Sequence, residues 1–429
     1  MVQPPVTPHR RYDRDMSKII TDTASKIWSV FANNIAIVLN LFWKWIGAPL
    51  IAVIIGIMFL NRVTNWFVGP ESYKIYVVGG PDERINTKMW DAFNGLEDGD
   101  IGGVKIKIVT ISSDEDGAAG LSERLAGLDD TLMVVGHLYS TSSKSALPAY
   151  LNADPPIPVI LPTETSPVVF IPSTEVYLPV FRLAPNDDDQ AAKAADLIMK
   201  QGAKAIWVVE DESNSAYSHY LGEQFVRNIH EKKSGKVMLW TTTRGSPSPE
   251  TLKALGIDGV FFAGHWSEGI ILARNARVSL KNPGLPIVLS DWCADPALIE
   301  QGGADMKGVY LISPITAKEV YDEGFGYWGA LAHQTTHQLL RSANERFDDL
   351  ASQNGGTIYY MHKILNIHRV ADARRVLRST MEEHVLKEQP LVLKGKEYIF
   401  RHNGFARDSI FHIWQVRSQA GKEEFADVE

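Results

Sequence analysis

The stretch that decides the fold reads Leu132-Met-Val-Val-Gly-His-Leu-Tyr-Ser-Thr-Ser-Ser143, and a second run follows it, Pro158-Val-Ile-Leu-Pro-Thr-Glu-Thr-Ser-Pro167. In both, an apolar run of strand length ends in a cluster of hydroxyl residues. Such continuous apolar runs are typical of parallel strands that are buried on both faces of a sheet. The hydroxyl clusters then fall at the carboxyl ends of strands, where open α/β sheets bind ligands. We therefore expect the two clusters to form one wall of a small-molecule site.

Strands alternate with helices on both sides of this stretch. Before it, strands are predicted at 74–80 and 104–109 and helices at 85–96 and 121–128. After it, a helix at 190–201 leads into further strands at 205–210, 236–241, 259–264 and 286–290, with a helix at 217–231. Alternation of this kind predicts an α/β fold of two doubly wound parallel-sheet lobes.

Composition narrows the function classes. A chain of 429 residues suggests two or three structural units, and the net charge of −8 argues against nucleic acid as a partner. The lone cysteine, Cys293, excludes an internal disulfide and a multi-cysteine metal site. His333 and His337 have a metal-binding spacing but lack the Glu of a His-Glu-x-x-His motif. With no Walker loop or Gly-x-Ser-x-Gly elbow, we expect no metal, no cofactor and no enzyme.

The N-terminal region predicts a membrane anchor. Residues 46–60 carry no charge, and 45–67 reaches the roughly 20 apolar residues that a bilayer span needs. Tryptophans flank this segment, and basic residues crowd 1–44. We therefore predict a single-pass inner-membrane protein with residues 1–44 cytoplasmic and the body extracytoplasmic; a buried core helix is the alternative. Residues 27–42 suggest an interfacial helix or a second span.

Five stretches together resemble a known family. Gly136–Ser143 is similar to the first ligand-binding loop of the branched-chain amino-acid-binding proteins, which are type I periplasmic binding proteins that serve ABC importers. Leu161–Pro167 resembles the family's second loop, and Val180–Asp187 its Phe-Arg-x-x-Pro-x-Asp entry into the second lobe. Asp291–Leu298 and Phe400–Val416 resemble later motifs and the C-terminal hairpin.

The resemblance covers about residues 73 to 417 and implies two lobes that close on a ligand about a hinge. It implies the following division of the body: lobe 1 at 68–184, lobe 2 at 185–312, a return to lobe 1 at 313–398, and a C-terminal hairpin at 399–429 that joins lobe 2. Asp187–Asp189 is interpreted as a charged helix start rather than a cation site.

The first wall of the implied cleft comes from lobe 1. By motif, Ser140 and Thr165 bind a ligand carboxylate, helped by backbone N–H groups near Thr141 at a helix start, which physics also favours for an anion. Ser140 is alternatively a simple helix N-cap. Thr163 matches a position that offers a backbone carbonyl. Glu164 departs from the family's small residue, and either reaches the ligand or points to solvent.

The second wall comes from lobe 2. Tyr217 matches an aromatic residue that stacks on the ligand, and Asp291 matches an acid that pairs with a ligand ammonium; a helix cap or surface acid is the alternative for Asp291. By the same resemblance, His265 and Trp266 are also expected to bind the ligand. Trp266 and Trp292 replace small residues, so a branched-chain amino acid cannot be assumed, and their rings could hold a quaternary ammonium.

Three functions follow from this interpretation. The first is a membrane-tethered solute-binding receptor that captures a small amino-acid-like or carboxylated ligand and passes it to an ABC permease. The second is a sensing ectodomain that signals through a membrane partner without transport, which the basic residues 1–44 favour. The third is a degenerate scaffold whose cleft is filled by Trp266 and Trp292.

Overall fold

A computed structural model describes residues 71–428 except 95–98, 114–116, 168–178, 233–235, 242–243, 365–368, 402–404, 407–409 and 420, together with 25, 26, 28–30 and 32–35. The chain divides into two compact units, Met1–Val68 and Gly69–Glu429. The second unit contains both sheets described below, and each sheet forms the centre of one lobe.

Lobe 1 is built on a six-stranded sheet with the order β2-β3-β1-β4-β5-β6. Neighbouring strands pair in parallel, except that β2 pairs antiparallel with β3. The strands are β1 (Ser72–Gly79), β2 (Asp100–Ile101), β3 (Val104–Ser112), β4 (Thr131–Val135), β5 (Val159–Leu161) and β6 (Val180–Arg182).

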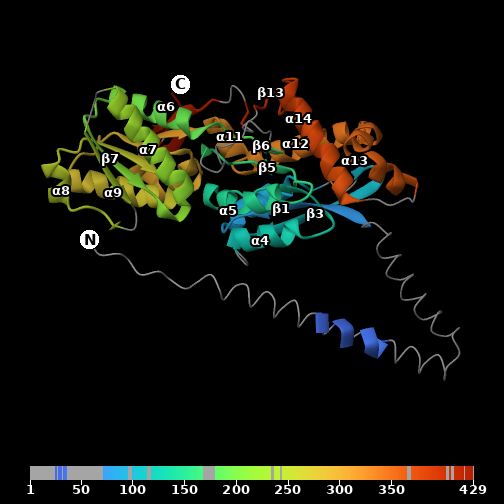
Figure 1. The fold of residues 1–429 in the computed structure, drawn as a ribbon. Coiled ribbons are helices and arrows are strands. Elements are labelled where there is room, and N and C mark those ends of the chain that lie inside the picture. The colour runs from blue at the N-terminus through green and yellow to red at the C-terminus, as the bar shows by residue number, and fades with distance from the viewer. Residues whose placement is uncertain are drawn as a thin grey trace, which may run out of the picture. The chain divides into compact units, whose positions relative to one another are not determined.

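Helices cover both faces of this sheet (Figure 1). Apolar side chains of α4 (Gly117–Ala126) and α5 (Ser140–Leu151) form a core with one face. The other face packs against α3 (Glu83–Asp91), α12 (Gly326–Glu345) and α14 (Val370–Leu386). Outside these lie α13 (Phe347–Ile364), which packs on α14, and a small hairpin of β12 (Leu391–Leu393) and β13 (Lys396–Tyr398).

Lobe 2 is built on a seven-stranded sheet with the order β15-β14-β11-β10-β9-β7-β8. Its five parallel strands are β7 (Ala205–Glu210), β8 (Lys236–Thr241), β9 (Gly259–Ala263), β10 (Ile287–Leu289) and β11 (Tyr310–Ser313). The C-terminal hairpin of β14 (His412–Gln419) and β15 (Lys422–Asp427) adds two antiparallel strands beside β11.

Two sets of helices also sandwich the lobe 2 sheet (Figure 1). On one face, α6 (Asp187–Lys200) and α7 (Ser215–Glu231) form a core that includes the stacked rings of Phe225 and Phe261. On the other face lie α8 (Pro249–Ala254), α9 (Trp266–Leu280) and α10 (Ala297–Gly302). Shorter helices complete the lobe: η3 (Glu212–Asn214), η5 (Asp291–Cys293), η6 (Gly303–Met306) and α11 (Ala317–Asp322).

These sheets confirm the predicted α/β fold with two lobes of mainly parallel strands. The chain passes between the sheets three times, after β6, after β11 and before β14. Three crossings in one place allow the lobes to rotate about a common hinge. The predicted strands 205–210 and 236–241 coincide with β7 and β8, whereas the exact domain boundaries stay predictions.

Local sequence explains how two loops reach the cleft. Gly136 follows β4 with a φ of 115°, and a Cβ there would lie 2.3 Å from the Val78 carbonyl oxygen, so only glycine fits. This turn delivers the start of α5. As predicted, Asp187–Asp189 form the first turn of α6, whose N-cap Asn186 accepts a hydrogen bond from the Asp188 N–H.

The N-terminal unit is described in part only. The described residues between 25 and 35 are helical, and Trp28 and Val30 among them are exposed. In the portion of the chain that the structure describes, no helix has the length and apolar character needed to cross a bilayer. The predicted span 45–67 lies outside the described residues, as does most of the segment 27–42.

Candidate ligand-binding cleft

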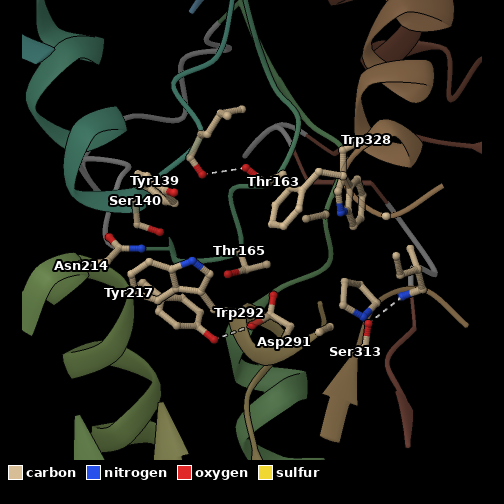
Figure 2. Close-up of a pocket in the computed structure, with 17 residues that line it drawn as sticks. Tyr139, Ser140, Thr163, Thr165, Asn214, Tyr217, Asp291, Trp292, Ser313 and Trp328 are labelled. Carbon is tan, nitrogen blue, oxygen red and sulfur yellow. Dashed lines mark hydrogen bonds between the residues drawn. The ribbon is translucent and has the colours of Figure 1, made fainter. Parts of the chain in front are cut away.

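A cavity of about 60 Å³ lies between the two lobes, at the carboxyl ends of the central strands. Lobe 1 supplies one wall from the loops after β4 and β5, and lobe 2 supplies the other from η3, α7 and η5 (Figure 2). The lining residues are Leu138, Tyr139, Ser140, Thr163, Thr165, Ala184, Asn214, Tyr217, Asp291, Trp292, Ala294, Ser313, Pro314, Ile315, Gly324, Phe325 and Trp328.

Six of the ten residues selected from the sequence line this cavity. They come from both lobes, although up to about 150 positions separate them in the chain. Figure 2 shows the Tyr217, Trp292, Asp291 and Thr165 side chains grouped around the same space. The six are Ser140, Thr163, Thr165, Tyr217, Asp291 and Trp292.

The other four predicted residues lie elsewhere. Glu164 is fully buried behind the lobe 1 wall, so it takes neither of the two expected positions, against the ligand or in solvent. Thr141 makes contacts between the lobes at the cleft edge. His265 lines a separate outer cavity together with Trp292, and Trp266 packs against the apolar core.

The hydroxyl groups of lobe 1 are largely engaged within the protein. The Ser140 hydroxyl donates to Glu164 Oε1 at 2.7 Å, and the Thr163 hydroxyl donates to the Leu138 carbonyl at 2.7 Å. The backbone N–H of Thr141 donates to Asn214 Oδ1 at 3.0 Å. The N-cap of α5 is Tyr139 rather than Ser140, so Ser140 is not the simple cap considered above.

The lobe 2 wall carries an acid. Tyr217 is held on α7 and donates its hydroxyl to Asp291 Oδ1, which lies at the start of η5. Burial raises the pKa of the Asp291 carboxyl, while hydrogen bonds from Gln190 and Tyr217 lower it in part. The Trp292 ring meets Tyr139 at 5.5 Å and Tyr217 at 6.0 Å between centroids, which closes one side of the cavity with aromatic surface.

Three further ionisable side chains, those of Glu164, Arg182 and Asp187, are buried behind the cavity. Burial raises the pKa of Glu164 to about 7, although the Arg182 guanidinium opposes this, and burial lowers the pKa of Arg182 to about 9. Burial and then the charge of Asp291 raise the pKa of Asp187 well above its usual range; the Thr165 hydroxyl opposes this in part. Neither Asp187 oxygen has a hydrogen bond of ordinary geometry among the described residues. Among the described residues, Arg182 is the buried cation that Glu164 and Asp187 face, and both acids raise its pKa against the effect of burial.

Direct bonds hold the lobes closed around the cavity. The Thr141 hydroxyl accepts the Ala216 N–H at 3.1 Å, and the Ser166 hydroxyl donates to the Ala216 carbonyl at 2.8 Å. On the outer side, the Arg84 guanidinium of α3 makes two hydrogen bonds of 3.1 and 2.8 Å to Asp295 of lobe 2. Such forked pairs are geometrically specific, so they favour one closed arrangement of the lobes.

The sequence did not point to several lining residues. Tyr139 lies inside the predicted ligand-binding loop Gly136–Ser143, but no motif assigns it a role in binding. Asn214 lies just before the predicted helix 217–231. Phe325 and Trp328 belong to Gly324-Phe-Gly-Tyr-Trp-Gly329, which fits the Gly-x-Gly-x-x-Gly pattern of nucleotide-binding turns. In the structure this segment follows helix α11 rather than a strand, so the context that gives the pattern its meaning is missing.

Comparison with known proteins was informative for structure alone. No protein-family model and no curated protein sequence matches the chain. Its structure is similar to a leucine-binding protein of Thermotoga maritima, with a TM-score of 0.63 and 20% identity over 82% of this chain and 97% of that one. The isoleucine complex of a branched-chain amino acid transporter substrate-binding protein of Streptococcus pneumoniae gives a TM-score of 0.58 and 16% identity over 83% and 99%.

A third similar structure was solved with a different ligand. It is a solute-binding protein of R. palustris in complex with benzoate, with a TM-score of 0.56 and 12% identity over 83% of this chain and 96% of that one. The chain has the type I periplasmic-binding-protein fold. This confirms at the level of fold the resemblance found in the sequence motifs. The cavity described above occupies the interlobe cleft of that fold.

Proposed function

We propose that the chain is a solute-binding receptor, and not an enzyme, that captures a small amino-acid-like or carboxylated ligand in the interlobe cleft. One observation carries this proposal: polar residues of both lobes line a single cavity, and direct hydrogen bonds join the lobes at its edge. A ligand that contacts both walls binds the closed state better than the open state, so it shifts the population toward closure. Closure is then the state that a membrane partner recognises.

The similar structures support this proposal by their printed ligands. One is a leucine-binding protein, one was solved with isoleucine and one with benzoate. All three are small molecules that carry a carboxylate. Thr165 and Asp291, which the resemblance assigns to a ligand carboxylate and a ligand ammonium, both line the cavity, and this supports the proposal.

A thermal-shift screen of the full chain in mild detergent tests the receptor function. The panel comprises the natural amino acids, small carboxylates, amides and amines. A ligand present at about 100 times its dissociation constant adds about 2.7 kcal/mol to stability, which gives a clear shift in Tm. Thr165→Ala and Asp291→Ala should remove the shift. If no compound in the panel stabilises the protein, the receptor proposal fails.

We infer that residues 45–67 anchor the body to the inner membrane, with residues 1–44 cytoplasmic. The uncharged run and its flanking tryptophans support this topology. A cysteine at exposed Lys253, introduced as Lys253→Cys in a Cys293→Ser background, reports on it in intact spheroplasts. Labelling by a membrane-impermeant thiol reagent is expected; labelling only after lysis would reverse the orientation.

We further propose delivery of the ligand to an ABC permease, with signalling through a membrane partner as the second candidate. The basic segment 1–44 favours the second, because delivery from outside the membrane gives a cytoplasmic arm no role. Crosslinking of the full chain in its native membrane separates the two. A ligand-dependent crosslink to a permease supports transport, whereas one confined to a different membrane protein supports sensing.

A further inference from the structure

We propose that the cleft selects an organic ammonium ion that lacks a carboxylate, and that the corresponding free amino acid binds more weakly. This inference rests on the receptor function proposed above, and it replaces the carboxylated ligand of that proposal with the corresponding amine. It comes from two features of the cleft: three of the donors that would hold a carboxylate are engaged elsewhere, and the one ionisable side chain that lines the cavity among the described residues, apart from tyrosines, is an acid.

The carboxylate of an amino acid would find few free hydrogen-bond donors in the cleft. The Ser140 hydroxyl donates to Glu164, the Thr163 hydroxyl to the Leu138 carbonyl, and the Thr141 N–H to Asn214. A ligand carboxylate that recruited these groups would leave buried Glu164 without one of its hydrogen bonds. Burying a charge without partners is costly, so the exchange would weaken binding.

The cleft has acidic groups that could hold a ligand ammonium. Asp291 is the only charged side chain among the described residues that line the cavity. Asp187 is buried close behind it, and neither of its oxygens has a hydrogen bond of ordinary geometry among the described residues. The buried cation Arg182 donates to the Ser166 carbonyl at 2.8 Å and lies 3.3 Å over the Phe405 ring. A ligand ammonium would pair with the Asp291 carboxyl and favour its ionised form, against the burial that raises its pKa.

Aromatic side chains suit the remainder of such a ligand. Trp292 contacts the Tyr139 and Tyr217 rings, and Trp328 lies across the cavity from them (Figure 2). Phe325 also lines the cavity. Ring faces attract ammonium groups and also pack against apolar chains. The ring faces offer nothing to a carboxylate, whose charge they would desolvate, and the Trp292 indole N–H is a buried ring donor here that has no hydrogen-bond partner among the described residues.

An outer cavity of about 620 Å³ extends the same preference toward solvent. It shares Tyr139 and Trp292 with the inner cavity, so these two side chains separate the compartments. Its acidic lining residues are Asp82, Asp211, Glu212 and Glu268. His265 is its one basic lining residue among those described, and burial lowers the pKa of His265 and keeps it neutral. Acidic walls attract cations and repel anions on the way in.

Matched pairs of ligands test the inference directly. Each pair keeps the side chain and the amine and differs only in the carboxylate: isoamylamine and leucine, phenethylamine and phenylalanine, cadaverine and lysine, agmatine and arginine. Choline and benzoate serve as a carboxylate-free cation and an amine-free anion. Affinities for the full chain are measured by calorimetry after a thermal-shift screen. For at least one pair, the amine should bind tenfold or more tightly than its amino acid.

The outcomes separate this inference from the receptor proposal. If in every pair that binds the amino acid binds as tightly as its amine, or if benzoate alone binds, the inference is overturned and the receptor function stands. No binding by any compound overturns both. Asp291→Asn should weaken amine binding about thirtyfold or more, as expected for loss of a buried charge pair. The matched control Asp196→Asn, at an exposed acid of the same lobe, should change nothing.

Discussion

The two walls of the cleft differ in how much of their polarity is available. The lobe 1 wall is rich in hydroxyl groups, yet Ser140 and Thr163 donate their protons to Glu164 and Leu138. The lobe 2 wall has fewer hydroxyl groups, yet it places Asp291 in the cavity lining. The difference shows that a hydroxyl group in the wall can bind a ligand only if it is not already hydrogen-bonded to a buried group of the protein. On the lobe 1 side, those neighbours are Glu164 and Arg182.

Removing Arg182 should have the largest effect on the lobe 1 wall. Arg182→Met leaves Glu164 and Asp187 without their one buried counter-charge, so the free energy of unfolding should fall by about 3–5 kcal/mol. Urea denaturation of the full chain measures it. Exposed Arg341, which pairs only with Glu345 on its own helix, provides the control: Arg341→Met should cost less than about 0.5 kcal/mol. Equal effects of the two variants would refute the buried cluster.

The second largest effect should be the change of stability with pH that the ionisation of Glu164 causes. Its folded pKa of about 7 lies above the ordinary value of 4.5, so its stabilising contribution is full below pH 4.5 and is lost as pH rises through 7. The loss over that window is roughly 3 kcal/mol. Arg182 and Asp187 are the charged groups nearest to Glu164, and the lowered pKa of Arg182, about 9, lies outside this window.

Glu164→Gln isolates this contribution. The variant should reduce the slope of the stability profile between pH 4.5 and 7, measured as Tm or as the urea midpoint, and the slope that remains comes from Asp187 and Asp291, whose pKa values are also raised. Exposed Glu345 serves as the control, and Glu345→Gln should keep the wild-type slope. A wild-type slope in Glu164→Gln as well would show that another group titrates in this range, and the account of Glu164 would be wrong.

Loss of the Arg84–Asp295 pair should make closure of the lobes less favourable. Its effect should be smaller than the two effects described above. Arg84→Ala removes a bond between the lobes that lies outside the inner cavity, so it should weaken ligand binding about five- to tenfold through the closed-state population alone. Calorimetry with the best ligand of the screen measures it. Arg274 makes a comparable exposed pair with Asp305 within lobe 2, and Arg274→Ala should leave affinity unchanged. Equal affinities in both variants would exclude Arg84 from closure.

The sequence predicted the parts of this molecule that depend on short stretches. Apolar runs located β7 and β8, and the motifs brought Tyr217, Asp291 and Thr165 to one cavity. The three site residues were implied by the family resemblance, whereas the two strands depend on neighbours within a few residues along the chain. The periodicity of buried side chains is strong enough there to be recognised without tertiary information.

The partners of the side chains could not be predicted in the same way. Glu164 seemed free to reach the ligand or solvent, because nothing local shows that Ser140 and Arg182 surround it. Trp328 reaches the cavity from a helix in the returning part of lobe 1, far from the motifs. Hydrogen-bond direction depends on which buried acid competes for a proton, and that competition exists only after the lobes have folded.

The smallest expected effect concerns Ser140 and separates the two interpretations of the lobe 1 wall. If its hydroxyl serves Glu164, Ser140→Ala should change amine affinity less than about threefold while raising the Glu164 pKa, so that the loss of stability moves to higher pH. If the hydroxyl instead anchors a ligand carboxylate, the variant should lose affinity about tenfold. Ser145, on the exposed side of α5, gives the control Ser145→Ala. If Ser140→Ala loses much affinity and keeps the wild-type pH profile, the polar groups of the lobe 1 wall are as available to the ligand as those of the lobe 2 wall.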